Sequence, residues 1–237
     1  MGKFKKIEQN VPDLNRTFVS GNINYSKSST KNGNIAIIKA INSSYSKPIE
    51  KWGEVFEIDK EVIISFIATE SGGKNTKPNR FLATGLMQVT PNAVAESLPK
   101  FRTVTGQPMP IDAVNYLNTK GSFLMQLKRD VPLSTTNRSK ILSLLENDSE
   151  FNIVVGTIYL RFLLQMFSDA NTAFLNKAMI AYNAGAYNAA LRSYGKAAVK
   201  SDTLVNNRKL PLESRSYVLK MLGVDGFLDL IIQQKVI

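Results

Sequence analysis

The sequence predicts a mainly α-helical fold with at most a small irregular β element and an extended N-terminal arm. Three observations support this class. Apolar residues recur at helical spacing after residue 47, no alternating series marks strands, and residues 1–46 are rich in Asn, Ser, Lys and Gly. A chain of 237 residues is long enough for one sizeable core. We therefore expect an arm at 1–46, one domain at 47–225 and a C-terminal helix at 226–237.

Start and stop signals place the first helices of this domain. The pattern becomes helical at Pro48, and Asp59 is a plausible N-cap for a helix that runs to about Glu70. The sequence Ser71-Gly72-Gly73 then ends that helix. Thr90 followed by proline predicts an N-cap and a first helical turn, opening a helix to about residue 97.

The rest of the domain also reads as helical, less regularly at first. Prolines and a glycine interrupt residues 98–147, which predicts short helices and loops. Ser149 is expected to cap a long helix over 151–167, and Thr172 a helix that ends near Tyr182. Further helices are expected at 212–222 and 227–237. Within the arm, the apolar residues of 34–41 predict a short helix or strand packed on the domain.

Composition excludes several kinds of chemistry. The chain has no cysteine and no histidine, which excludes disulfides, thiol nucleophiles, histidine-based triads and the usual zinc ligands. We expect no cofactor and no metal. The net charge of +11 predicts an anionic partner. Nucleic acid is disfavoured because the basic residues are scattered rather than clustered.

The chain shows no sequence signal for a membrane. No uninterrupted apolar stretch approaches the roughly 18 residues that span a bilayer, so we expect no transmembrane segment. The positively charged start at residues 1–8 has no apolar run after it, so we expect no signal peptide.

Glu70 is the first candidate for chemistry. It follows Val62, Ile63, Phe66 and Ile67 at helical spacing, so it continues the apolar stripe of its helix. Burial raises the pKa of a carboxyl group, which would keep a proton available near neutral pH. A lone Glu at a helix end is more often a cap or half of a salt bridge, so its neighbours must decide.

Five short blocks supply that context. They are Glu70-Ser71, Gly85-Leu86-Met87-Gln88-Val89-Thr90-Pro91, Asn152-Ile153-Val154-Val155-Gly156, Ala181-Tyr182-Asn183-Ala184-Gly185 and Glu213-Ser214-Arg215-Ser216-Tyr217-Val218. In this order, over about residues 48–222, they resemble the soluble lytic transglycosylase (SLT) family of lysozyme-like proteins. The resemblance implies a lysozyme-like SLT domain.

The resemblance also implies the reaction. Such enzymes cleave the β-1,4 bond between N-acetylmuramic acid and N-acetylglucosamine in peptidoglycan and form 1,6-anhydromuramic acid. Ordinary glycosidases use two carboxylates, whereas this family needs one. The 6-hydroxyl of the muramic acid attacks its own anomeric carbon, so no water enters. Glu70 is then the acid and afterwards the base.

The family pattern assigns further roles. Tyr182 matches a tyrosine whose hydroxyl hydrogen-bonds the catalytic carboxyl, so we expect it to be catalytic together with Glu70. Gln88 matches a residue that lines the sugar cleft, and Glu213 a carboxylate that binds substrate. The other expected substrate-binding residues are Ser71, Asn79, Gly85, Met87, Thr90 and Asn183. Arg215 is expected to brace the helix packing.

Several of these positions have alternatives or depart from the family. Asn183 could instead cap its helix, Met87 could be core filler, and Glu213 could pair with Arg215 or Lys209. Asn79 stands where many members have serine, and Thr90 where many have methionine. Leu82-Ala83 replaces a common Gly-Ala pair.

Two other functions remain open. A goose-type lysozyme reaction would use water and needs a second base, which the sequence does not identify. A virion or secretion-machine component that grips peptidoglycan without cutting it would keep the fold alone. The basic arm and the missing signal peptide suggest a phage protein in the virion, or in the host periplasm and cell wall after holin release or secretion. The arm would dock on phage tail or capsid proteins.

Overall fold

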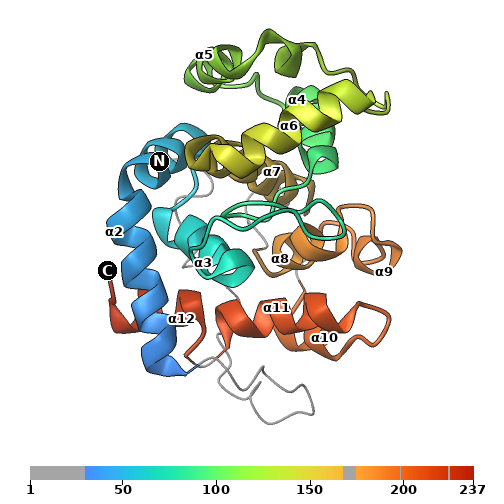
Figure 1. Ribbon diagram of the computed structural model, residues 1–237. Helices are drawn as coiled ribbons and strands as arrows, with labels where there is room; N and C mark the ends of the chain where they lie inside the picture. The colour runs from blue at the N-terminus through green and yellow to red at the C-terminus, as the bar shows by residue number, and fades with distance from the viewer. Residues whose placement is uncertain (1–29, 168–174, 198, 224) are drawn as a thin grey trace.

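The computed structural model describes residues 30–167, 175–197, 199–223 and 225–237. Figure 1 shows that they form a mainly α-helical assembly. Within these ranges the only β pairing is an isolated bridge between Thr84 and Val89, the small β element that was expected. The helices are α2 (Lys31–Phe56), α3 (Lys60–Ser71), α4 (Pro91–Thr105), α5 (Ile111–Lys120), the 3-10 helix η2 (Ser122–Gln126), α6 (Thr135–Asn147), α7 (Ser149–Phe167), α8 (Leu175–Ala184), α9 (Ala189–Arg192), α10 (Ser201–Asn206), α11 (Leu212–Leu222) and α12 (Phe227–Gln234).

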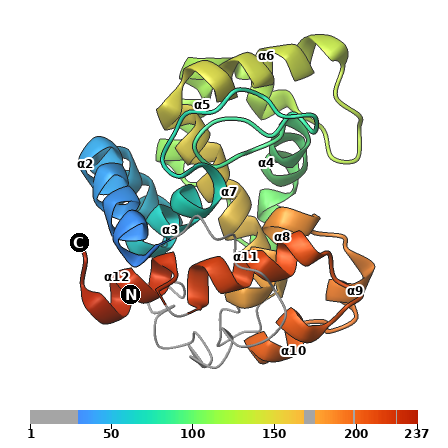
Figure 2. The ribbon, with the colours of Figure 1, turned by 60° about the horizontal axis from the view of Figure 1, so that its bottom comes forward.

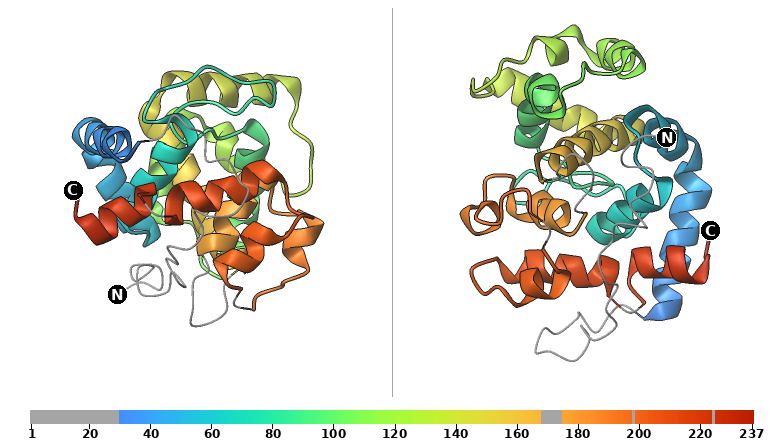
Figure 3. Two further views of the ribbon diagram at one scale, coloured as in Figure 1. Left: turned by 90° about the horizontal axis from the view of Figure 1, so that it is seen from below. Right: turned by 180° about the vertical axis from the view of Figure 1, so that it is seen from behind.

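Helix α7 is the centre of the core. It contacts α2, α4, α6 and α8, and the view from behind in Figure 3 shows it crossing the molecule beside α2. Every residue from Phe151 to Leu164 is buried, because a helix that is apolar all round needs partners on every side. By length and composition α7 could also cross a membrane, but most of it is buried inside this domain, as expected of a core helix.

Helix α2 changes the expected boundary of the N-terminal arm. It runs unbroken from Lys31 to Phe56, through Pro48, and its side chains Ile38 and Ile41 lie in the core. The boundary at residue 46 therefore falls inside a helix. Residues 31–46 pack on the domain as the apolar run at 34–41 suggested. Removing the isoleucine side chains of this run from water is favourable in free energy, so the run packs on the core. The remainder of the arm, residues 1–29, lies outside the described residues.

The other end of the chain packs beside α2. Helix α12 contacts α2, α3 and α11, and Figure 2 shows it next to α2. The Asn34 side chain donates a hydrogen bond of 2.8 Å to the backbone carbonyl of Asp225, and Leu228 and Leu230 are fully buried. The C-terminal helix expected at 226–237 thus ends at Gln234 and is part of the same core.

Helix ends confirm some signals and correct others. Thr90 caps α4 by accepting from the Ala93 amide at 3.1 Å, although α4 runs on to Thr105 rather than ending at 97. Asp59 is at the N-cap position of α3 but makes no side-chain capping hydrogen bond. For α7 the cap is Asp148, whose carboxylate accepts from the Phe151 amide at 2.9 Å, and not Ser149. The predicted cap Thr172 lies outside the described residues.

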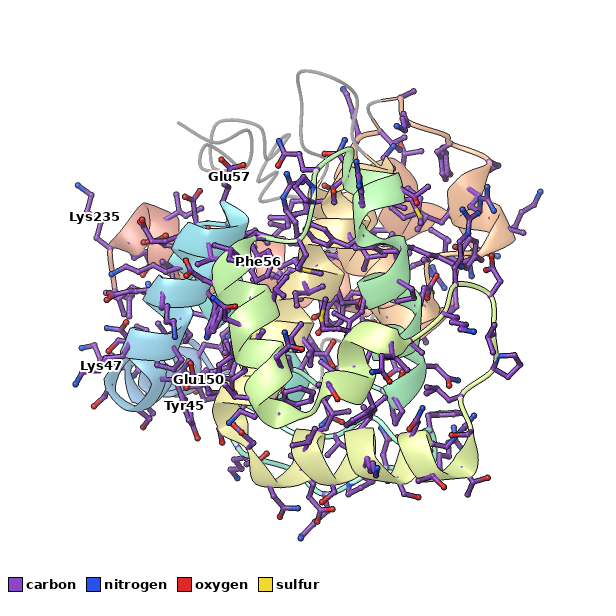
Figure 4. The ribbon with its side chains drawn as sticks, turned by 90° about the horizontal axis from the view of Figure 1, so that it is seen from above. Tyr45, Lys47, Phe56, Glu57, Glu150 and Lys235 are labelled. Atoms are coloured by element: carbon purple, nitrogen blue, oxygen red, sulfur yellow. The ribbon has the colours of Figure 1, made fainter. Side chains whose placement is uncertain are left out.

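The packing of α2 on α7 fixes the frame that holds α3. The Trp52 indole donates to the Glu150 carboxylate at 3.0 Å, and Phe56 points into the interior, whereas Glu57, Lys47 and Lys235 lie at the periphery (Figure 4). Gly53 permits a close approach to the next turn, because a Cβ there would lie 2.7 Å from the Ile58 carbonyl. Helix α3 is therefore held directly against α2.

Candidate active site

One pocket gathers residues from four separate parts of the chain. It has a volume of about 770 Å³ and is lined by the end of α3, the loop between α3 and α4, the end of α8, and α11. Figure 1 shows helices α3, α8 and α11 near one another. Its lining residues are Thr69, Glu70, Asn79, Arg80, Phe81, Ala83, Gln88, Thr90, Tyr182, Asn183, Glu213, Tyr217 and Lys220. The expected residues Glu70, Asn79, Gln88, Thr90, Tyr182, Asn183 and Glu213 are thus brought together.

Glu70 occupies the last turn of α3, immediately before the helix ends at Gly72. The sequence terminates the helix there because Gly72 adopts a left-handed φ of 62°, which glycine reaches without strain. The Phe66 ring, one turn before Glu70, packs at 5.0 Å from the Tyr182 ring and 5.8 Å from the Tyr217 ring. The carboxyl group therefore lies among aromatic side chains.

This setting raises the pKa of Glu70 to about 8. Burial is the main cause, because it penalises the charged form. The Tyr217 hydroxyl lowers the pKa, the nearby charge of Glu213 raises it, and that of Lys220 lowers it. Glu70 consequently keeps its proton at neutral pH, as a general acid must.

The family pattern implied that the Tyr182 hydroxyl hydrogen-bonds Glu70, but the hydrogen bond that this hydroxyl donates goes to another residue. The Tyr182 hydroxyl donates to the backbone carbonyl of Met87 at 2.9 Å, so its proton is already engaged. The Tyr217 hydroxyl is buried without a hydrogen-bond partner among the described residues, and it lies near enough to Glu70 to lower the pKa of the carboxyl. Tyr182 lines the pocket and packs on Phe66.

The loop between α3 and α4 holds Gln88 in an unusual conformation. Gln88 has a φ of 48°, a left-handed geometry that costs a residue with a Cβ about 1 kcal/mol or more. Its side-chain amide donates to the Gly85 carbonyl at 2.9 Å and to the Thr76 hydroxyl. Such strain is retained where a side chain must be held in one place, and here it holds Gln88 in the pocket wall.

A buried asparagine on α7 fixes this loop from behind. The Asn152 side-chain oxygen accepts from the Met87 amide at 2.8 Å, and its nitrogen donates to the carbonyls of Thr84 at 2.8 Å and Leu145 at 3.1 Å. Gly85, with a φ of 77°, lies so close that a Cβ would be 2.1 Å from the Asn152 amide nitrogen. The blocks at 85–91 and 152–156 are therefore one structural unit.

Helices α8 and α11 meet at the opposite wall. The Ser214 hydroxyl donates to the Asn183 side-chain oxygen at 2.6 Å, which ties the two helices together, so Asn183 both lines the pocket and supports it. Among the described residues Glu213 forms no ion pair with Arg215 or Lys209. Arg215 instead donates to the Val205 carbonyl at 3.1 Å and braces α11 on α10, as expected.

Three expected substrate-binding residues are outside the pocket lining. The Ser71 hydroxyl donates to the Ile67 carbonyl and accepts from the Gly73 amide, so it serves the helix end. Met87 is fully buried, and its sulfur lies against Gly156. Gly85 is buried against Asn152. Met87 and Gly85 therefore support the pocket wall from the side of α7, whereas Ser71 stabilises the end of α3.

The sequence analysis missed other lining residues, notably Arg80, Phe81, Tyr217 and Lys220. Tyr217 and Lys220 follow Glu213 at i+4 and i+7 on α11, so helical spacing placed all three on one face and was the signal that could have found them. Arg80 and Phe81 lie in a loop without regular spacing, where no such signal exists.

These features define a class of protein before any comparison. The fold is mainly α-helical, and its pocket holds a carboxylic acid with a raised pKa at a helix end. In the described residues no group of three or more His, Cys, Asp and Glu side chains is suited to a metal ion.

Comparison with known families gave a match over part of the chain. Residues 47–116 match the family model described as the transglycosylase SLT domain, a match that is consistent with an SLT, lysozyme-like family. The comparison with curated proteins gave no match. The matched stretch contains Glu70 and the block at 85–91, whereas Tyr182, Glu213 and Tyr217 come from outside it. The match supports a lytic-transglycosylase-type enzyme with peptidoglycan as its substrate.

Proposed function

We propose that this protein is a peptidoglycan lytic transglycosylase that cleaves the β-1,4 bond between N-acetylmuramic acid and N-acetylglucosamine and forms a 1,6-anhydromuramic acid end. One observation carries the proposal. Glu70, with its pKa raised to about 8, lines the same pocket as residues of α8 and α11 that lie outside the family match. The motif blocks at 181–185 and 213–218 therefore support the site that the matched stretch begins.

The proposed reaction uses Glu70 twice. The protonated carboxyl first gives its proton to the glycosidic oxygen, so that the bond from this oxygen to the muramic anomeric carbon breaks and the glucosamine leaves as an alcohol. The muramic 6-hydroxyl oxygen then bonds to the anomeric carbon. Its proton returns to the Glu70 carboxylate, so the enzyme is restored and no water is consumed.

Other pocket residues support these steps. The Tyr217 hydroxyl lowers the pKa of Glu70, so it favours the carboxylate that forms after the first proton transfer. Gln88 and Asn183 present amide groups that suit the N-acetyl and hydroxyl groups of the sugars. The buried Tyr182 fixes the Met87 carbonyl and hence the loop.

Hydrolysis is the second candidate, because the pocket holds a second carboxylate. Glu213 lines it and lies close enough to Glu70 to raise the pKa of Glu70. A carboxylate opposite the acid is what an inverting glycosidase uses to activate water. The hydrolytic alternative therefore gains a named base that the sequence analysis could not supply.

The test is mass spectrometry of the muropeptides released from purified peptidoglycan. The native protein should release anhydromuramic ends, one water lighter than hydrolytic fragments, and Glu70→Gln should release none while keeping its fold. Glu96→Gln is the matched control, because burial also raises the pKa of Glu96 but Glu96 does not line the pocket. It should leave the product yield unchanged.

Other outcomes contradict the proposal. Reducing ends that disappear in Glu213→Gln would show a hydrolase with Glu213 as base. No products at all would favour the binding or structural alternative. Phage origin, docking through residues 1–46 and location in the virion or the host periplasm stay predictions.

A further inference from the structure

An aromatic side chain and a cation form the rim of the pocket. Phe81 is 67% exposed although it is wholly apolar, and the Arg80 guanidinium lies 4.6 Å from the centre of its ring. A single exposed phenylalanine needs no explanation elsewhere on a surface. Here both residues line the pocket that contains Glu70, so both can touch whatever binds there.

The loop that carries this pair is built to hold it still. The Asn79 side-chain oxygen accepts from the amides of Phe81 at 2.8 Å and Ala83 at 3.1 Å. The backbone N–H of Asn79 donates to the backbone carbonyl of Ala83 at 3.1 Å. The backbone N–H of Leu82 donates to the backbone carbonyl of Asn79 at 2.9 Å. The backbone is thus fixed before a ligand arrives, which lowers the entropy cost of binding.

The backbone conformation of Leu82 shows that neighbouring hydrogen bonds hold this loop in a strained geometry. Its φ of 63° is left-handed, a geometry that glycine adopts freely and that strains leucine. The Asn79 hydrogen bonds on either side enforce it. Arg80 and Phe81 are therefore presented by a defined turn.

Arg80 has no anionic partner in the part of the chain that the structure describes. It forms no ion pair or side-chain hydrogen bond there, and its contact is the Phe81 ring. A guanidinium group presents a planar set of donors that matches a carboxylate with two parallel hydrogen bonds. The pocket thus offers an available cation at its rim beside an apolar ring.

We infer that Arg80 and Phe81 form a subsite that recognises the acidic substituent of muramic acid. The Phe81 ring packs on the apolar face of a sugar, and Arg80 binds a carboxylate. In peptidoglycan the carboxylate belongs either to the peptide stem or, where the stem is missing, to the lactyl group. N-acetylglucosamine has neither, so the pair distinguishes muramic from glucosamine units. The inference rests on the proposed function.

The test is binding, measured by calorimetry with Glu70→Gln so that no ligand is cleaved. Three oligosaccharide probes are used: glycan strands with peptide stems, glycan strands stripped of stems, and neutral N-acetylglucosamine oligomers. In the double variant that carries Glu70→Gln and Arg80→Gln, binding of a carboxylate-bearing probe should weaken about tenfold. The affinity for the neutral oligomer should change by less than about twofold. The tenfold loss should shrink at high salt.

Comparing the three probes identifies which carboxylate Arg80 binds. A loss confined to stem-bearing strands assigns Arg80 to the peptide stem, and a loss on stripped strands assigns it to the lactyl group. Phe81→Ala should weaken binding of all three probes, and Phe81→Tyr should retain it. Arg102→Gln, a change at an exposed arginine outside the pocket, is the control and should bind like its parent.

The outcomes separate the two proposals. If Arg80→Gln weakens all three probes equally, or none of them, while its parent binds glycan, the subsite is wrong and the proposed function stands. If the parent binds none of the probes, both the subsite and the peptidoglycan substrate are wrong.

Discussion

At the residue scale, Tyr217 and Tyr182 both lie near Glu70 and have different roles. Burial keeps it protonated, with a pKa of about 8, and Tyr217 acts in the opposite sense by favouring the carboxylate. Tyr182 engages the Met87 carbonyl and holds the loop. Activity that requires the acid form of Glu70 should therefore be constant at neutral pH and fall as the pH rises through about 8.

Removing the Tyr217 hydroxyl should move this fall to higher pH. In Tyr217→Phe the carboxylate of Glu70 loses the hydroxyl that favours it, so the pKa of Glu70 rises further. The measurement is the pH dependence of kcat/KM on peptidoglycan fragments. Tyr182→Phe is the control: it should reduce activity, less than Glu70→Gln does, without moving the alkaline limb. Equal shifts in both variants would contradict the assignment of Tyr217.

At the scale of elements, the loop between α3 and α4 depends on α7. Asn152 satisfies one amide and one carbonyl of the loop, and Gly85 leaves the space that this asparagine needs. The strained Gln88 is held in the same unit. A change that displaces Asn152 should therefore affect stability and the pocket together.

Two glycine substitutions test this dependence. Gly85 and Gly106 have similar φ values of 77° and 74°, but a Cβ at Gly85 would meet Asn152 and the Leu145 carbonyl, whereas nothing lies within 4 Å at Gly106. Gly106→Ala should cost about 1 kcal/mol of unfolding free energy for the left-handed backbone alone. Gly85→Ala adds overpacking and should cost about 3 kcal/mol or more.

Denaturant unfolding of both variants gives the two free energies. Equal losses would mean that the loop relaxes away from α7 and that Asn152 does not hold it. The activity of Gly85→Ala should fall with its stability, whereas Gly106→Ala should remain active, because its helix end is remote from the pocket lining.

At the scale of the whole molecule, residues 31–46 are part of the domain core. The Ile38 side chain on α2 is fully buried, whereas a separate arm would lie on the surface of the domain. Ile38→Ala should therefore cost about 2–4 kcal/mol of unfolding free energy, as buried isoleucines do. Ile111→Ala removes the same atoms from a side chain that is 68% exposed and should change stability by less than about 0.5 kcal/mol.

Thermal or denaturant unfolding of the full chain distinguishes the two interpretations of this region. If Ile38→Ala were as mild as Ile111→Ala, residues 31–46 would be a dispensable arm after all. A large loss would place the start of the folded domain near residue 31.

The sequence by itself determined the fold class and the candidate acid, because both depend on local patterns. Helical periodicity placed Glu70 at the end of a buried stripe, and capping chemistry located the start of α4 at Thr90. Ordered motif blocks indicated a resemblance to the SLT family, and the match at residues 47–116 agrees with it. The long helix α7 was visible as a continuous apolar run.

Only the tertiary structure decided which side chains face one another. Whether Tyr182 or Tyr217 reaches Glu70 depends on how α8 and α11 are rotated against α3, and no local pattern contains that rotation. The same holds for Arg80 and Phe81, whose positions follow from the Asn79 turn. Residues 31–46 looked like an arm because their composition is polar overall, whereas burial depends on the few apolar side chains that reach the core.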